Sequence, residues 1–401
     1  MVVILLCAAE AVSFTGIPAK SPLRELPHIL SGNYFFGAVM AGVFVMHLVL
    51  VVSRLEILLV TAAATVFFAV FYLIDASSGG GVLLVQQAAV GAGFASIAAL
   101  AIRTAASKGE GRENTLSVLL PAIFLPLLML LFQFCLDLTA SIFPATLDPV
   151  VYAADMAFGT QLSFVLGDLL ADNPLFLRAT FAGYFALPAA LAFIYGIERK
   201  SIAPPRLDII TSFIGIVIAG YAVYLFFPVA GPKFAFYGAY PDFMPPLADI
   251  ISHEKIIVTP VPRNCMPSLH TALALIIFWH SRSFAPRVRV LTGFFLAATV
   301  FSTVALGFHY VVDVIAAVPF TVAMEAISAA AVGNSSREVR RAAVSGSLLA
   351  AAWLILLRYG TSLIVDYREI FWVFSAATIP VSLYIKKILD REIYAEALPE
   401  N

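Results

Sequence analysis

Long apolar stretches constrain this chain more than any other feature of its sequence. A helix needs about 20 apolar residues to cross the ~30 Å hydrocarbon layer of a bilayer. The sequence predicts eleven such helices, near residues 34–53, 55–75, 83–102, 116–136, 176–197, 209–229, 266–281, 290–308, 309–332, 343–365 and 370–387. A shorter stretch at 2–18 would be a twelfth. Glu10 interrupts it and no basic flank precedes it, so a signal peptide, a short first helix and an interfacial segment all stay open.

The composition excludes a water-soluble class. Of the 401 residues, 61% are hydrophobic and only 12% are Asp, Glu, Lys or Arg. So few charges cannot cover the surface of a soluble chain of this size. We therefore predict an all-α, polytopic integral membrane bundle. The net charge of −1 argues against nucleic acid as a partner. The three cysteines are scattered and suggest neither a disulfide framework nor a thiolate metal site.

Lysines and arginines gather at alternate ends of the apolar stretches, and cytoplasmic loops carry such a basic excess. The predicted cytoplasmic group comprises Arg54, Arg103, Lys108, Arg112, Arg199, Lys200, Arg206, Arg282, Arg287, Arg289, Arg337, Arg340, Arg341, Lys386, Lys387 and Arg391. The two largest outer loops are then 137–175 and 230–265. The first contains acids and short apolar runs but no basic residue, so we expect a helical cap that lies flat on the outer membrane surface.

Ionisable residues near or inside membrane helices are candidates for a functional site, because their burial is unfavourable. His309 and Asp313 are four residues apart and would share one face of a helix. We expect a direct hydrogen bond of ~2.6–3.2 Å between them. It would fix the tautomer of the imidazole and make His309 an oriented nucleophile or base. The alternative is an interfacial histidine followed by a cap-like acid.

The segment from Arg263 to His270 predicts a helix start that suits an anion. Pro267 is expected at the first helical position, which puts Ser268 and His270 in the first turn. Unpaired backbone N–H groups and a serine hydroxyl at such a position attract phosphate. In the alternative, Ser268 only caps the helix and His270 packs in the core.

Lys233 follows an apolar span and a Gly-Pro turn, so its ammonium is expected near the outer surface. A lone lysine there is more often a snorkelling anchor than a ligand. The predicted orientation, however, brings six candidate residues to one face and to a similar depth: Lys233, Arg263, Ser268, His270, His309 and Asp313. This convergence favours a functional site over a set of unrelated structural residues.

Together these residues resemble the three-part signature of the type 2 phosphatidic acid phosphatase superfamily, which reads KxxxxxxRP, PSGH and SRxxxxxHxxxD. The corresponding parts run here from Lys233 to Tyr240-Pro241, from Pro267 to His270, and from Ser302-Thr303 to His309 and Asp313. The motif PSLH and the segment GFHYVVD look closest to the inositolphosphotransferase-like branch. This branch contains the inositol phosphorylceramide synthases of the aureobasidin-resistance type and many bacterial relatives. The resemblance covers about residues 140–330.

The resemblance implies an enzyme with a six-helix catalytic core. His309 would attack phosphorus to form a phosphohistidine, Asp313 would orient it, and His270 would protonate the leaving oxygen. Lys233 and Ser268 would hold the phosphoryl oxygens. No metal or other cofactor is implied. His270, His309 and Asp313 could form a two-His-one-carboxylate metal site, but a pocket with a cation and a helix start suits an anion better.

The sequence departs from the signature at its arginines. Tyr240 and Thr303 stand in their place, and Leu269 replaces the glycine of PSGH. A phosphate pocket would thereby lose two bidentate clamps. Arg263 is the first candidate to replace them, with its guanidinium pointing into the cavity, and Arg358 is the second. Tyr240 stays a candidate phosphate-binding residue by its position in the signature.

The predicted function is transfer of a phosphoryl or phospho-head group of a lipid at the outer membrane face, with a phospholipid or lipid phosphate as substrate. A lipid phosphate or pyrophosphate phosphatase is the alternative, and a non-catalytic transporter or membrane scaffold is the second alternative. We expect a multi-pass protein of the bacterial inner membrane. Residues 1–137 would be helices of unknown role, 138–335 the catalytic core, and 336–401 the C-terminal helices with a short cytoplasmic tail.

Overall fold

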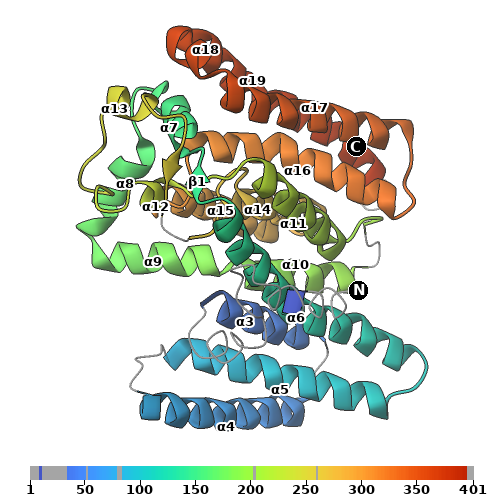
Figure 1. The fold of residues 1–401 in the computed structure, drawn as a ribbon. Coiled ribbons are helices and arrows are strands. Elements are labelled where there is room, and N and C mark those ends of the chain that lie inside the picture. Colours follow the sequence, from blue (N-terminus) through green and yellow to red (C-terminus); the bar gives the residue numbers. More distant parts are fainter. Residues whose placement is uncertain are drawn as a thin grey trace. The chain divides into compact units, whose positions relative to one another are not determined.

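The computed structural model describes residues 9–10, 34–50, 53–78, 84–201, 205–258 and 261–394 (Figure 1). Apart from Ala9 and Glu10, the predicted stretch at 2–18 lies outside these residues. The elements are, in chain order, α3 (Tyr34–Val49), α4 (Arg54–Ser78), α5 (Leu84–Ala106), α6 (Glu110–Ile142), β1 (Ala145–Thr146), α7 (Asp148–Met156), α8 (Leu162–Ala171), α9 (Pro174–Phe185), α10 (Leu187–Lys200), α11 (Ile209–Phe226), α12 (Pro232–Ala235), α13 (Leu247–Ile251), β2 (Ile256–Ile257), α14 (Leu269–His280), η1 (Ser281–Ser283), α15 (Pro286–Ala305), α16 (Val311–Ala331), α17 (Arg337–Tyr359), α18 (Thr361–Asp366) and α19 (Arg368–Ile393). The predicted all-α membrane class is confirmed.

Seven helices of the described part are long and apolar enough to cross a membrane: α5, α6, α11, α15, α16, α17 and α19. An eighth span results if α9 and α10, which are bent by 44° at their junction, count as one. The predicted number of eleven is not confirmed. One reason is α14, which has only 12 residues, because Ser268 caps its start and η1 follows its end. At 1.5 Å per residue such a helix is about 18 Å long, too short for a full span.

The chain divides into two compact units, which are described separately. Unit 1 comprises residues 1–137 and 185–201, and unit 2 comprises 138–184 and 202–401. In unit 1, close helix packing depends on glycine. A Cβ on Gly42 of α3 would lie 2.8 Å from the carbonyl oxygen of Pro188, and one on Gly91 of α5 would lie 2.8 Å from that of Ala64. Small residues of this kind let membrane helices pack backbone to backbone.

Helix α16 is the central helix of unit 2. It packs against α11, α14, α17 and α19, and 67% of its span is buried, against 22–39% for the other spans. Alanines on its buried face allow this packing. A Cβ on Gly346 of α17 would lie 2.9 Å from the backbone nitrogen of Ala323. Because α16 is fixed on several sides, its N-terminal end is a rigid place to hold a functional side chain.

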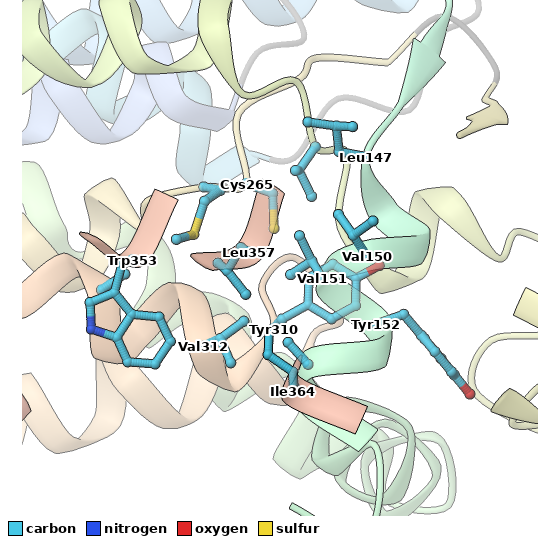
Figure 2. Close-up of a cluster of buried hydrophobic side chains, with 14 of the residues drawn as sticks. Leu147, Val150, Val151, Tyr152, Cys265, Tyr310, Val312, Trp353, Leu357 and Ile364 are labelled. Carbon is cyan, nitrogen blue, oxygen red and sulfur yellow. The ribbon is translucent and has the colours of Figure 1, made fainter. Parts of the chain in front are cut away.

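Helix α7 is buried inside unit 2. Every residue from Asp148 to Asp155 is buried, and Val150, Val151 and Tyr152 contribute to an apolar cluster with residues of α16, α17 and α18 (Figure 2). The prediction of a cap lying flat on the membrane surface is therefore wrong for α7, because its acids have backbone partners and need no solvent. Helix α8 does expose apolar side chains, namely Leu162, Val165 and Leu169. The strand pair β1–β2 joins the two loops that were predicted to be outer ones, in antiparallel register.

A buried ionic cluster ties α19 to the core of unit 2. The Nζ atom of Lys386 lies 3.0 Å from Oε1 of Glu325 on α16, and it also contacts Asp390. Nε2 of His280 on α14 lies 3.5 Å from the same Glu325 oxygen. The sequence placed Lys386 in the basic group of the cytoplasmic side, at the end of the predicted span 370–387. It is instead fully buried within α19, because a helix turn brings it under Trp279 and opposite Glu325.

We expect Lys386→Met to lower the free energy of unfolding by about 3 kcal/mol, because it leaves the Glu325 carboxylate buried without its main cation. Lys387→Met is the matched control, since Lys387 is exposed on the same helix. Thermal unfolding of both variants in mild detergent measures the difference. Adding Glu325→Gln to Lys386→Met should restore most of the loss. Equal melting temperatures for the two single variants would contradict a structural role for this pair.

Candidate active site

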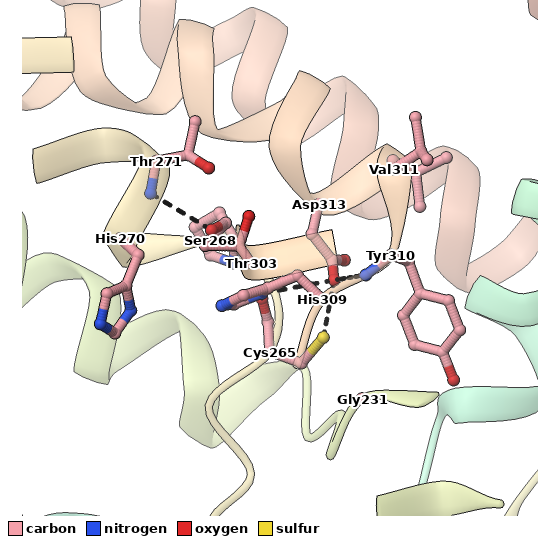
Figure 3. Close-up of polar contacts among 12 residues, drawn as sticks. Gly231, Cys265, Ser268, His270, Thr271, Thr303, His309, Tyr310, Val311 and Asp313 are labelled. Carbon is pink, nitrogen blue, oxygen red and sulfur yellow. Dashed lines mark hydrogen bonds and ion pairs between the residues drawn. The ribbon is translucent and has the colours of Figure 1, made fainter. Parts of the chain in front are cut away.

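His309 lies in the turn between α15 and α16 (Figure 3). Gly307 makes the turn possible with a φ of +70°, a region that other residues rarely adopt. The carbonyl of Thr303 accepts hydrogen bonds from the backbone nitrogens of Phe308 and His309, at 3.2 and 3.1 Å. The turn therefore closes onto the last residues of α15 and presents the imidazole from a fixed backbone.

A backbone carbonyl fixes the orientation of His309. Its Nδ1 lies 2.7 Å from the carbonyl oxygen of Cys265. A carbonyl can only accept, so Nδ1 carries the proton and Nε2 is the nitrogen that remains for chemistry. Oδ2 of Asp313 lies 3.6 Å from Nδ1. The predicted direct hydrogen bond of His309 to Asp313 is therefore wrong, although the two side chains are neighbours as predicted.

Asp313 instead holds the turn itself. Its Oδ2 accepts hydrogen bonds from the backbone nitrogen of Tyr310 at 2.8 Å and from the thiol of Cys265 at 2.6 Å. Burial and the nearby Asp313 charge raise the pKa of Cys265 well above its ordinary value, which keeps the thiol protonated as a donor. Asp313, the N3 residue of α16, thus completes a capping box with the N-cap residue Tyr310 and places a negative charge beside the His309 ring.

His270 and His309 lie together, as predicted. Their ring centroids are 6.4 Å apart, well within the ~10 Å beyond which one phosphorus atom could not reach both rings. His270 occupies the first turn of α14 and stacks on Tyr184 of α9 with ring centroids 3.9 Å apart. The Tyr184 hydroxyl lies 3.1 Å from Nδ1 of His270. Tyr184 was not identified from the sequence, because a tyrosine in an apolar span carries no distinguishing signal.

Lys233 lies in the short helix α12, against the turn that carries His309. Its backbone nitrogen donates to the carbonyl of Gly307 at 2.8 Å. Its Nζ lies over the rings of Phe308 and Phe181, 5.4 and 5.8 Å from their centroids. Burial lowers the pKa of Lys233. Because Phe308 also packs on Tyr184, with centroids 5.1 Å apart, an aromatic wall connects Lys233 to the His270 side of the site.

Arg263 does not point into the site. Its guanidinium donates to four backbone carbonyls, those of Phe143, Val261, Val258 and Pro144, at 2.9, 2.6, 3.3 and 3.4 Å. The side chain is fully buried among them. The prediction of a phosphate clamp is therefore wrong. Arg263 instead joins its own loop to the end of α6 and the start of β1.

The remaining candidates are mostly engaged in holding the backbone. The Tyr240 hydroxyl donates to the carbonyl of Ala305 at 2.9 Å, and the Thr303 hydroxyl to that of Val300 at 2.8 Å. Ser268 is the N-cap of α14 and accepts from the backbone nitrogen of Thr271 at 3.3 Å, so Pro267 precedes the cap instead of opening the helix. Arg358 lies 3.8 Å from Glu254. This contact pairs the guanidinium with an acid, and a role of Arg358 in phosphate binding stays a prediction.

Two buried acids of α7 join the loops of the site, and the sequence did not reveal them. Asp148 accepts from the backbone nitrogens of Ala230 and Gly231 and from the Tyr310 hydroxyl, each at 2.9 Å. Asp155 accepts from the backbone nitrogens of Val311 and Val312, at 2.9 and 3.0 Å. The first acid fixes the loop that leads to Lys233, and the second caps α16 beside Asp313.

Cys265, His309 and Asp313 could also be viewed as a metal-ligand group. One donor atom from each lies within 4.8 Å of the others. In this arrangement, however, the thiol donates its proton to Asp313 and Nδ1 of His309 donates to the Cys265 carbonyl. Two of the three atoms therefore present protons instead of lone pairs, which favours a hydrogen-bonded network over metal coordination.

Residues 150–327 match a family model described as the PAP2 superfamily. This match supports the superfamily suggested by the signature, and the segment contains Lys233, Ser268, His270, His309 and Asp313. It is consistent with lipid phosphatase or phosphotransferase activity. Comparison with curated proteins and with solved structures gave no match.

Asp155 makes the stability of this region dependent on pH. Burial raises the pKa of its carboxyl from 3.8 to about 8, against the lowering effect of the two backbone N–H groups of α16. Because the unfolded chain releases this proton first, the contribution of Asp155 to stability should fall as pH rises from about 4 to about 8. The melting temperature of Asp155→Asn relative to the parent should therefore increase between pH 5 and pH 8.

Asp168→Asn is the control for this comparison, because Asp168 is exposed on α8. Its difference from the parent should not vary with pH in that range. A constant difference for Asp155→Asn as well would mean that the two N–H groups keep this carboxylate ionised throughout.

Proposed function

We propose that this protein transfers the phospho-head group of a membrane lipid to an acceptor hydroxyl through a phosphohistidine on His309. The observation that carries the proposal is the pair of imidazoles 6.4 Å apart, with Nδ1 of His309 bound to the Cys265 carbonyl. That hydrogen bond leaves Nε2 as the nucleophile. The PAP2 match over residues 150–327 supports the same class of chemistry.

In the first step, the lone pair of His309 Nε2 attacks phosphorus and the bond from phosphorus to the leaving alcohol oxygen breaks. His270 gives its proton to that oxygen. The ring of His309 becomes positively charged as the bond forms. Asp313, 3.6 Å from Nδ1, stabilises this charge, and the Cys265 carbonyl keeps the Nδ1 proton in place. In the second step, His270 takes the proton of an acceptor hydroxyl, whose oxygen displaces Nε2 from phosphorus.

The charges around the site favour a phosphodiester as the donor lipid. Arg263 is bonded to carbonyls and Arg358 to Glu254, so among the sequence candidates Lys233 is the cation that remains for the substrate. Its ammonium is itself partly dehydrated against Phe181 and Phe308. One such cation balances a singly charged diester better than a doubly charged monoester, whose burial would leave one charge without a partner. A phosphodiester lipid is therefore favoured over a lipid phosphate as the donor.

In the membrane, we propose that the site opens to the outer face. The positive-inside pattern supports this orientation, because the candidate residues lie at the ends of spans opposite to the basic loops. A polar acceptor could then come from the outer leaflet or from the aqueous phase.

The experiment that tests the function uses purified protein with two labelled donors, a phosphodiester lipid and phosphatidic acid with the same acyl chains. Each is incubated with and without diacylglycerol or a polyol as acceptor. The proposal expects the labelled phospho-head group of the diester to be transferred to the added acceptor, with no transfer product when the acceptor is left out. Phosphate released from phosphatidic acid, with no product from the diester, would show a phosphatase instead.

His309→Ala should lower turnover by about 10³-fold or more, because it removes the nucleophile. Asp313→Asn should keep a trace of activity, since Asp313 does not bond to phosphorus. His253→Ala is the control, because His253 is exposed. Label from the donor should also be trapped on the parent as an acid-labile, base-stable adduct and be absent from His309→Ala. Parent-like turnover in His309→Ala would exclude this site.

Tyr184→Phe should reduce turnover about tenfold with little change in KM, because the ring still stacks on His270 while the contact of its hydroxyl with Nδ1 is lost. A changed pH profile of kcat should accompany the loss, since this contact sets which nitrogen of His270 carries the proton. Tyr359→Phe, at an exposed tyrosine, serves as control. An unchanged pH profile would mean that Tyr184 only packs.

A further inference from the structure

Unit 1 contributes no residue to the proposed reaction, yet it contains two adjoining cavities. The first, of about 260 Å³, lies where the ends of α3, α5 and α10 meet the start of α6. We call it the basic cavity, because Arg103, Arg199 and Lys200 line it. The second, of about 620 Å³, is a groove between α4 and α5. Arg103 lines both.

The basic cavity carries an excess of positive charge. No acid is among its lining residues in the described part of unit 1. Arg103 is partly balanced by Glu56, which lies 3.3 Å away and also binds His47. Arg199 donates to the Ser117 hydroxyl at 2.9 Å, which holds its guanidinium at the cavity wall. Two further cations thus line a recess that could hold a phosphate group.

The groove is mostly apolar, with Ser53, Glu56 and Arg103 as its polar lining residues. Leu59, Ala63 and Phe67 of α4 face the small side chains Ala95, Ala98 and Ala99 of α5. The alanines leave room between the helices for a chain of methylene groups. A cationic recess that continues through a shared arginine into an apolar groove has the shape and polarity of a phospholipid.

We propose that unit 1 binds one anionic phospholipid, with its phosphate at Arg199, Lys200 and Arg103 and one acyl chain in the α4–α5 groove. A free phosphate would use only the basic cavity, whereas the groove requires an acyl chain. The basic ends of these helices belong to the predicted cytoplasmic side, where the leaflet is rich in anionic lipid. This site does not depend on the proposed reaction, and its test needs no activity measurement.

The first test counts lipids retained by the full chain. Protein purified in mild detergent is titrated with phosphatidylglycerol or with phosphatidylcholine of identical acyl chains, and bound lipid is followed by native mass spectrometry. The parent should retain one phosphatidylglycerol in preference to phosphatidylcholine. Arg199→Gln/Lys200→Gln should bind it roughly 30-fold more weakly. Arg287→Gln/Arg289→Gln makes the same charge change at exposed positions of α15 and should bind like the parent.

The second test separates a lipid from a free anion. Ala98→Phe fills the groove, and Ala101→Phe adds the same ring at an exposed position of α5 outside it. Only Ala98→Phe should weaken the binding of phosphatidylglycerol. Glycerol phosphate, which has no acyl chain, should not compete. Competition by glycerol phosphate together with an inert Ala98→Phe would replace the lipid with a soluble anion. Equal loss in both arginine double variants, or in neither, would overturn the site altogether.

Discussion

The site depends on hydrogen bonds between two buried acids of α7 and the backbone of two loops. Asp148 accepts hydrogen bonds from the backbone nitrogens of Ala230 and Gly231 and from the hydroxyl of Tyr310. Asp155 accepts from the backbone nitrogens of Val311 and Val312 at the start of α16. Burial of an acid is unfavourable unless donors replace water. Here the unpaired N–H groups at a helix start supply them, and the helix dipole adds to the attraction. The same contacts hold the loop of Lys233 and the turn of His309 to one helix, so the geometry of the site follows from where α7 is buried.

The sequence predicted the parts of the site that follow from local rules. Spacing predicted that His309 and Asp313 are neighbours, although His309 lies in the turn before α16 and not on the helix. Ser268 begins a helix that carries His270, as the sequence suggested. The sequence could not predict which of several hydrogen-bond donors would bind a given acceptor in the folded chain. Asp313 has several donors within reach, and the backbone nitrogen of Tyr310 and the Cys265 thiol take its oxygen in place of the imidazole. The carbonyl that orients His309 belongs to a residue 44 positions away. Because every residue has a backbone carbonyl, the sequence does not indicate which one the imidazole will bind.

The fold was predictable in class but less so in detail, for a related reason. Hydropathy indicates that a segment avoids water, but not whether lipid or protein covers it. Helix α14 and helix α7 are both surrounded by protein, so a 12-residue helix and a helix with two acids can be buried there. Lys386 was assigned to the cytoplasmic end of the predicted span 370–387, because basic residues gather at such ends. Its burial depends on Glu325, 61 residues earlier in the chain, and no local pattern reports such a pair.

The substitutions at the signature arginines have a common physical consequence. Tyr240 and Thr303 both donate to carbonyls at the end of α15, and Tyr240 packs so closely that a Cβ on Gly307 would lie 2.5 Å from its ring. The two charged guanidinium groups of the signature are thereby replaced by neutral hydroxyl groups, which make the turn of His309 more rigid. A stiffer turn preserves the position of the nucleophile, while the loss of two cations lowers the negative charge that the cavity can accommodate. Substrate charge and backbone rigidity are thus coupled at the same two positions, and a chain with this pattern should differ from one with both arginines in the ionic form of the phosphate it accepts.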